Sequence, residues 1–211
     1  MERLETFRTL FKACPLVAII RGVEPDEVEA IGDALVEAGI RIVEVPLNSP
    51  RPLDSIFRLS RHLAGRALVG AGTVLRVEQV AEVAAAGGGI IVSPNSDQDV
   101  IRATVRAGLV SSPGYFTPSE AFMALDAGAH ALKLFPAEAA PPAVVKAHRA
   151  VLPPAIPLIV VGGVSPDKMA AYRAAGADGF GLGSGLYKPG MDASEVAARA
   201  AAFVAALTRE G

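Results

Sequence analysis

Asp126-Ala-Gly-Ala-His-Ala-Leu-Lys-Leu134 joins the end of an amphipathic, alanine-rich stretch to a short apolar run through a glycine. A glycine at this point favours the left-handed residue that ends a helix. The apolar run that follows is typical of a buried strand. The same order of helix, glycine and strand recurs at residues 36–45, 106–112 and 175–182, which predicts a chain built from repeated helix–strand units.

Eight apolar runs are expected to form strands, and helical stretches follow most of them. Runs that are apolar throughout favour a parallel sheet covered by helices. We therefore predict an α/β fold, a (β/α)₈ TIM barrel in a single domain over residues 1–211, with an extra helix before it at Glu2–Ala13. The alternative, an open doubly wound sheet, is disfavoured because no G-x-G-x-x-G turn follows an early strand. The predicted strands are residues 16–20, 42–45, 67–70, 90–92, 109–112, 131–134, 158–161 and 179–182.

Composition excludes several partners. A net charge of −2, from 20 basic and 22 acidic residues, offers no reason to expect nucleic acid or an anionic membrane. Prolines interrupt the longest uncharged stretch, and the N-terminus lacks a secretory pattern, so we expect no membrane span and a cytoplasmic location. The three histidines have no spacing suited to a metal site, and no metal or cofactor is expected.

Function in such a barrel lies at the carboxyl ends of the strands, on side chains that point inward. Polar residues there depart from the local apolar pattern, as is expected at a functional site. The positions that end these strands or follow them, with the inward orientation, include Arg21, Glu44, Thr73, Pro94, Lys133, Phe135, Val161 and Ser184.

Lys133 interrupts an apolar strand, where alternation places it on the same face as Ala131 and Phe135. The other four lysines, Lys188 in a late loop among them, have ordinary surface explanations. Burial should lower the pKa of the Lys133 amine and make it a nucleophile that can form a Schiff base with a ketone. Glu44, between two valines, suits the general acid and base that such a lyase needs. A buried structural salt bridge between the two residues is the alternative.

Glycine-rich turns follow the last two predicted strands, at residues 160–164 and 181–185. Glycine lets backbone N–H groups approach phosphate oxygens, and loops in these two positions commonly bind phosphate in such barrels. Ser184 can add a hydroxyl group. Two ordinary tight turns are the alternative. Arg21, after the first strand, can either pair with a substrate carboxylate or cap a loop.

These residues resemble the 2-keto-3-deoxy-6-phosphogluconate (KDPG) and phosphogalactonate aldolases over nearly the whole chain. The resemblance implies a pyruvate-dependent Schiff-base lyase on a (β/α)₈ barrel, with Lys133 forming the Schiff base, Glu44 moving protons and Thr73, Pro94 and Phe135 lining the pyruvate end. It also implies phosphate binding by Gly162, Gly163, Gly183 and Ser184, and a homotrimer. The matching segments are 43–50, 70–73, 92–95, Pro113-Gly114, 131–136 and 161–164.

The resemblance also bears on the substrate. The gluconate branch usually carries an arginine where this chain has Asn48 and a threonine where it has Val161. Both departures, and Arg21 followed by Gly22, look like the galactonate branch, in which the arginine is expected to anchor the carboxylate. The expected substrate is a phosphorylated keto sugar acid, cleaved to pyruvate and glyceraldehyde 3-phosphate. The alternatives are the gluconate epimer, acceptance of both epimers, or a barrel that binds a phosphosugar without cleaving it.

Overall fold

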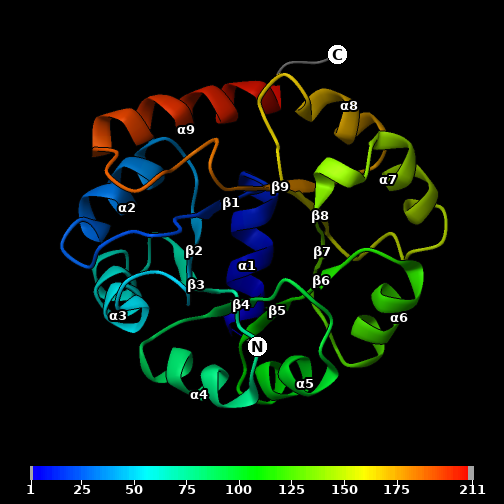
Figure 1. The fold of residues 1–211 in the computed structure, drawn as a ribbon, viewed down its shortest axis with the longest axis horizontal. Helices are drawn as coiled ribbons and strands as arrows, with labels where there is room; N and C mark the ends of the chain where they lie inside the picture. Colours follow the sequence, from blue (N-terminus) through cyan, green and yellow to red (C-terminus); the bar gives the residue numbers. More distant parts are fainter. Residues whose placement is uncertain (1, 209–211) are drawn as a thin grey trace.

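The structure, a computed structural model, describes residues 2–208 as a ring of parallel strands inside a ring of helices (Figure 1). The strand order is β5-β4-β3-β2-β1-β9-β8-β7-β6, and every pairing is parallel. The strands are β1 Leu16–Ile19, β2 Ile42–Pro46, β3 Leu68–Gly72, β4 Ile90–Val92, β5 Val110–Ser112, β6 Gly114–Tyr115, β7 Leu132–Leu134, β8 Leu158–Val161 and β9 Gly179–Leu182. The helices are α1 Glu2–Ala13, α2 Val28–Glu37, α3 Pro52–His62, α4 Val77–Ala85, α5 Gln98–Arg106, α6 Pro118–Asp126, the 3₁₀ turn η1 Ala137–Ala139, α7 Pro142–Arg149, α8 Met169–Ala174 and α9 Ala193–Thr208.

The predicted barrel is confirmed, with one difference in strand count. The fifth predicted strand, residues 109–112, corresponds to β5, and the additional short strand β6 follows it after Pro113, which interrupts the strand because proline has no N–H to donate to a neighbouring strand. The carbonyl groups of Ser111 and Pro113 accept hydrogen bonds from the N–H groups of Ala131, at 3.2 Å, and Lys133, at 2.9 Å. These bonds join both segments to the β7 side and close the ring. β3 also ends at Gly72, two residues later than predicted.

Alternation along the strands separates two apolar clusters. Inward-facing side chains such as Val17, Ile42 and Ile159 fill the barrel, while Leu132 and Leu134 belong to the larger cluster between strands and helices. Lys133 lies between those two leucines and so points inward. None of the helices within residues 2–208 is long and apolar enough to cross a lipid bilayer.

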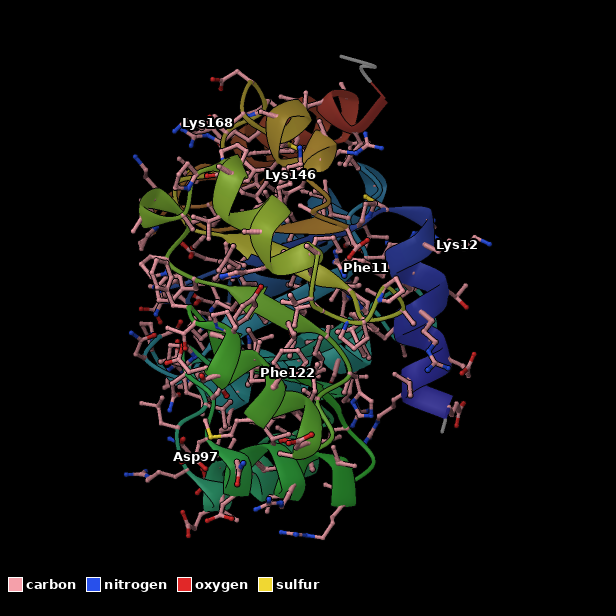
Figure 2. The ribbon with its side chains drawn as sticks, turned by 90° about the vertical axis from the view of Figure 1, so that its right-hand side faces the viewer. Phe11, Lys12, Asp97, Phe122, Lys146 and Lys168 are labelled. Carbon is pink, nitrogen blue, oxygen red and sulfur yellow. The ribbon has the colours of Figure 1, made fainter. Side chains whose placement is uncertain are left out.

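Helix α1 covers the amino-terminal end of the barrel, at the position predicted for the extra helix. Phe7 and Phe11 are buried in the interior cluster with their ring centroids 5.3 Å apart. Figure 2 shows Phe11 pointing from α1 toward the barrel and Lys12 pointing away from it. Asp97 and Lys168 lie at the opposite end of the molecule. Since α1 closes one end, a ligand can enter only from the end where the strands finish.

Gly70 lets two strands approach closely. A Cβ atom at this position would lie 1.9 Å from the carbonyl oxygen of Ile90 on the paired strand β4. That atom belongs to the backbone, so the neighbour cannot rotate away as a flexible side chain would. The close approach of β3 and β4 therefore requires glycine here.

We predict that Gly70→Ala lowers the free energy of unfolding by about 3 kcal/mol, toward the upper end of the cost of overpacking a core. Gly183→Ala is the matched control, because a Cβ atom there meets no other atom within 4 Å. Denaturant unfolding of both variants provides the measurement. Equal stabilities for the two variants would contradict the packing argument.

Candidate active site

A cleft of about 320 Å³ opens at the carboxyl ends of the strands. This volume is at the lower end of the range of small-molecule sites in proteins. Ten of the predicted site residues contribute to its wall, so the structure brings together residues from six strands and their following loops. The wall consists of Ile19, Arg21, Thr73, Pro94, Lys133, Phe135, Glu138, Val161, Gly162, Gly163, Val164, Gly181, Gly183, Ser184, Gly185, Tyr187, Lys188 and Pro189.

Lys133 brings an amine to the floor of this cleft. The residue is only 7% exposed, and its Nζ lies 4.8 Å from the centre of the Phe135 ring. Burial lowers the pKa of the amine, because the charged form loses its solvation, while the charge of Glu44 opposes this shift and that of Arg21 adds to it. A larger fraction of the Lys133 amine is therefore in the free, nucleophilic form than in an exposed lysine.

Glu44 lies on β2, deeper in the barrel than the open cleft, and is 2% exposed. Burial raises the pKa of its carboxyl group to about 7, against the opposing charges of Lys133 and Arg21. A group that titrates near neutral pH can both take up and release protons, which suits general acid and base catalysis.

Glu44 and Lys133 face a common interior gap without forming an ion pair. The described residues 2–208 contain no contact within 4 Å between the two charged groups, and Oε2 of Glu44 has no hydrogen-bond partner there. The gap that both residues line has a volume of about 10 Å³, close to the space that one water molecule needs. The structural salt bridge considered as an alternative is therefore absent.

Arg21 lies beside the mouth of the barrel and contacts two other predicted residues. Its guanidinium group donates a hydrogen bond to the side-chain oxygen of Asn48 and a longer one, of 3.5 Å, to the hydroxyl group of Thr73. Thr73 has a left-handed backbone with φ of 56°, an uncommon conformation for a residue other than glycine. Asn48 is not part of the cleft wall and reaches the site only through its hydrogen bond with Arg21. These contacts orient a cation toward the Lys133 end of the cleft.

The glycine turns after β8 and β9 form the other end of the cleft. Gly162 and Gly163 have φ values of +116° and +58°, which L side chains rarely adopt. Gly183 and Ser184 lie on the facing turn. The carboxylate group of Glu138 lies against the two paired glycines, and Nζ of Lys168 donates a hydrogen bond of 3.4 Å to the carbonyl group of Gly163.

Three residues with polar side chains in the cleft wall were not among the predicted site residues. Glu138 and Tyr187 were not singled out, and Lys188, which was expected to be an ordinary surface residue, lines the cleft instead. All three lie several residues after the end of a strand, where strand alternation no longer indicates which way a side chain points. Glu138, in the short turn after β7, was recognisable only from its closeness in sequence to Lys133. No cluster of three or more potential metal ligands occurs among residues 2–208.

Residues 8–202 match the family model for KDPG and KHG aldolases. The chain is 48% identical to the 2-dehydro-3-deoxy-6-phosphogalactonate aldolase of Escherichia coli (strain K12) over 192 residues, 91% of this chain and 94% of that protein. It is 33% identical to the KHG/KDPG aldolase of the same organism over 162 residues, 76% of this chain and 75% of that protein. A solved structure described as native KDPGal superposes with a TM-score of 0.90 at 48% identity, covering 92% of this chain and 94% of that one.

The coupling between the two buried groups gives a test by pH. The charge of Glu44 raises the pKa of Lys133, so Glu44→Gln should lower that pKa further and move the reaction of Lys133 with an amine reagent to lower pH. Peptide mass spectrometry after timed labelling at several pH values measures this at Lys133 alone. Glu37→Gln, on the exposed end of α2, is the control and should leave the profile unchanged. An unshifted profile in Glu44→Gln would show that the two groups are not coupled.

Proposed function

The chain belongs to the KDPG and KHG aldolase family, and we propose that it cleaves 2-dehydro-3-deoxy-6-phosphogalactonate to pyruvate and glyceraldehyde 3-phosphate. The observation that carries the proposal is the buried amine of Lys133 at the floor of the cleft, with the Glu44 carboxyl group behind it. An amine with a lowered pKa and a carboxyl group that titrates near pH 7 are the two groups that a Schiff-base lyase needs.

The first half of the reaction forms the Schiff base. The free amine of Lys133 attacks the C2 ketone of the substrate and gives a carbinolamine. Glu44 in its acid form protonates the departing hydroxyl group, water leaves, and a cationic imine joins C2 to Nζ. The Phe135 ring beside Nζ shields this bond from solvent and favours the cation through its π face.

The second half breaks the carbon–carbon bond. Glu44, now a carboxylate, removes the proton from the C4 hydroxyl group as the C3–C4 electron pair moves toward the imine nitrogen. Glyceraldehyde 3-phosphate leaves, and an enamine of pyruvate remains on Lys133. Glu44 returns the proton to C3. Water then attacks the cationic imine and gives a proton to Glu44, and the resulting carbinolamine breaks down to release pyruvate and restore the free amine and the acid form of Glu44. Each proton that Glu44 takes up is thus given back within one cycle.

The two ends of the cleft suit the two anionic ends of the substrate. Arg21 is proposed to pair with the carboxylate, beside Thr73 and Pro94, and the N–H groups of Gly162 and Gly163 to bind the phosphate with help from Gly183 and Ser184. Binding of a remote phosphate helps to position the reacting carbon atoms. Lys168, whose Nζ donates a hydrogen bond of 3.4 Å to the carbonyl group of Gly163, adds favourable charge near that end.

Three observations favour galactonate over gluconate as the sugar configuration. Identity is higher to the phosphogalactonate aldolase of Escherichia coli than to the KHG/KDPG aldolase of that organism. Val161, in the cleft wall between Lys133 and the paired glycines, offers no hydrogen bond to a C4 hydroxyl group. Asn48 contacts Arg21 at the position where the gluconate branch is expected to carry arginine. The homotrimer and the cytoplasmic location stay predictions.

The Schiff base is tested directly by trapping. Incubation of the native protein with pyruvate and borohydride should give a covalent adduct on Lys133, located by mass spectrometry. Lys133→Met, which removes the amine but keeps an unbranched side chain one atom shorter, should lose both the adduct and the release of pyruvate while circular dichroism shows an intact fold. A barrel that only binds a phosphosugar would give no adduct in the native protein. Turnover by the folded variant would overturn the role of Lys133.

The choice of epimer is tested at Val161. Val161→Thr introduces a hydroxyl group that can hydrogen-bond one C4 configuration, so use of the gluconate epimer should rise. A net hydrogen bond contributes about 0.5–1.5 kcal/mol, which limits the change to roughly tenfold. The measurement is the ratio of kcat/KM for the two epimers in both proteins. A native preference for the gluconate compound would contradict the galactonate proposal.

A further inference from the structure

Glu138 brings a carboxylate to the cleft wall at the place where a phosphate is expected. A Cβ atom built on Gly162 would lie 2.2 Å from Oε2 of Glu138, and one built on Gly163 would lie 2.7 Å from its Cγ. Two consecutive glycines therefore leave room for this side chain. Within residues 2–208 no hydrogen bond or ion pair satisfies the Glu138 carboxylate, which is exposed to the cleft. The group is thus available to a ligand.

The backbone that carries Glu138 is held firmly. Glu138 is the middle residue of the turn η1, which follows directly from the strand of Lys133. The single proton of the buried Tyr172 hydroxyl group is shared between the carbonyl groups of Ala137 and Ala140, at 3.2 and 3.1 Å, on either side of Glu138. A side chain on a turn fixed in this way has a defined reach into the cleft.

A carboxylate in this place is unfavourable for binding a phosphate alone, because like charges repel. It can only accept hydrogen bonds, so a matching ligand must offer a donor close to its phosphate group. In the substrate class proposed above, the C4 hydroxyl group lies at the reacting bond beside Lys133. The C5 hydroxyl group lies between that bond and the phosphate-bearing C6. Glu138, which contacts the glycines of the phosphate end, is placed for the second hydroxyl group.

We propose that Glu138 accepts a hydrogen bond from the C5 hydroxyl group of the substrate and so selects aldehydes that carry a hydroxyl group next to the carbonyl carbon. This inference rests on the proposed aldolase function and adds a specificity residue to it. In the synthetic direction the same hydroxyl group is that on C2 of glyceraldehyde 3-phosphate. Hydrogen bonds to charged acceptors are the stronger ones, so the contact outweighs the repulsion between Glu138 and the phosphate.

The test compares two acceptor aldehydes in condensation with pyruvate. One is glyceraldehyde 3-phosphate, and the other is 3-oxopropyl phosphate, which has the same length and phosphate but lacks the hydroxyl group. Glu138→Gln keeps the shape of the side chain and removes its charge, Glu138→Ala removes the acceptor, and Glu29→Gln on the exposed face of α2 is the matched control. Borohydride trapping of pyruvate is measured in parallel for every protein.

With glyceraldehyde 3-phosphate, kcat/KM should fall roughly tenfold in Glu138→Gln and ten- to a hundredfold in Glu138→Ala, the range for a lost hydrogen bond to a charged group. With 3-oxopropyl phosphate, neither variant should fall below the native protein, and trapping of pyruvate should be unchanged throughout. Equal losses with both aldehydes, or a gain with both from relieved repulsion, would overturn the role of Glu138. Absence of trapping in the native protein would overturn the aldolase function itself, and the inference with it.

Discussion

The burial of two ionisable side chains inside an apolar barrel is the constraint on which the site depends. Lys133 and Glu44 are 7% and 2% exposed, and the interior around them is built mainly from valine and isoleucine. Water that would stabilise both charges is excluded, so the amine is shifted toward its free form and the carboxyl group toward its protonated form. Because the two groups do not form an ion pair, the Lys133 amine is free to react with a ketone and the Glu44 carboxyl group is free to exchange a proton.

The same stretch of β3 that packs closely against β4 also makes room for the carboxyl group of Glu44. Gly70 allows β3 to approach β4, and a Cβ atom on Gly72 would lie 1.9 Å from Oε2 of Glu44. Both glycines have the inward orientation that a large side chain would otherwise fill. At the other end of the barrel, the stacked rings of Phe7 and Phe11 fill the interior, and a Cβ atom on Gly179 would lie 2.5 Å from Cζ of Phe11. Glycines thus leave room for the Glu44 carboxyl group near the functional end of the barrel, whereas aromatic rings fill the closed end.

Strand alternation predicted the residues that lie on strands and was less informative beyond them. Lys133 and Glu44 were placed correctly because side chains on a strand alternate with a period of two. Thr73 was assigned to the inward face, but the inward position of β3 falls on Gly72, and Thr73 reaches the cleft through its left-handed backbone. Glu138 and Lys188 lie in turns, which have no such period. Their place in the wall depends on how those turns pack, as with the Tyr172 hydroxyl group that holds the turn of Glu138.

Charge along the cleft alternates in a way that the net charge of −2 does not reveal. Arg21 lines the cleft after β1 and Lys133 lies at its floor, while the carboxyl group of Glu44 lies behind Lys133 and that of Glu138 lies against the paired glycines. A ligand with an anion at each end and hydroxyl groups in the middle matches this order, because anions meet cations or N–H groups and hydroxyl protons meet carboxylates. A shorter anion such as pyruvate matches only the Arg21 end. For the substrate proposed above, we therefore expect the order of charges to select the length of the ligand as well as its chemistry, and to present the central carbon–carbon bond to the two buried groups.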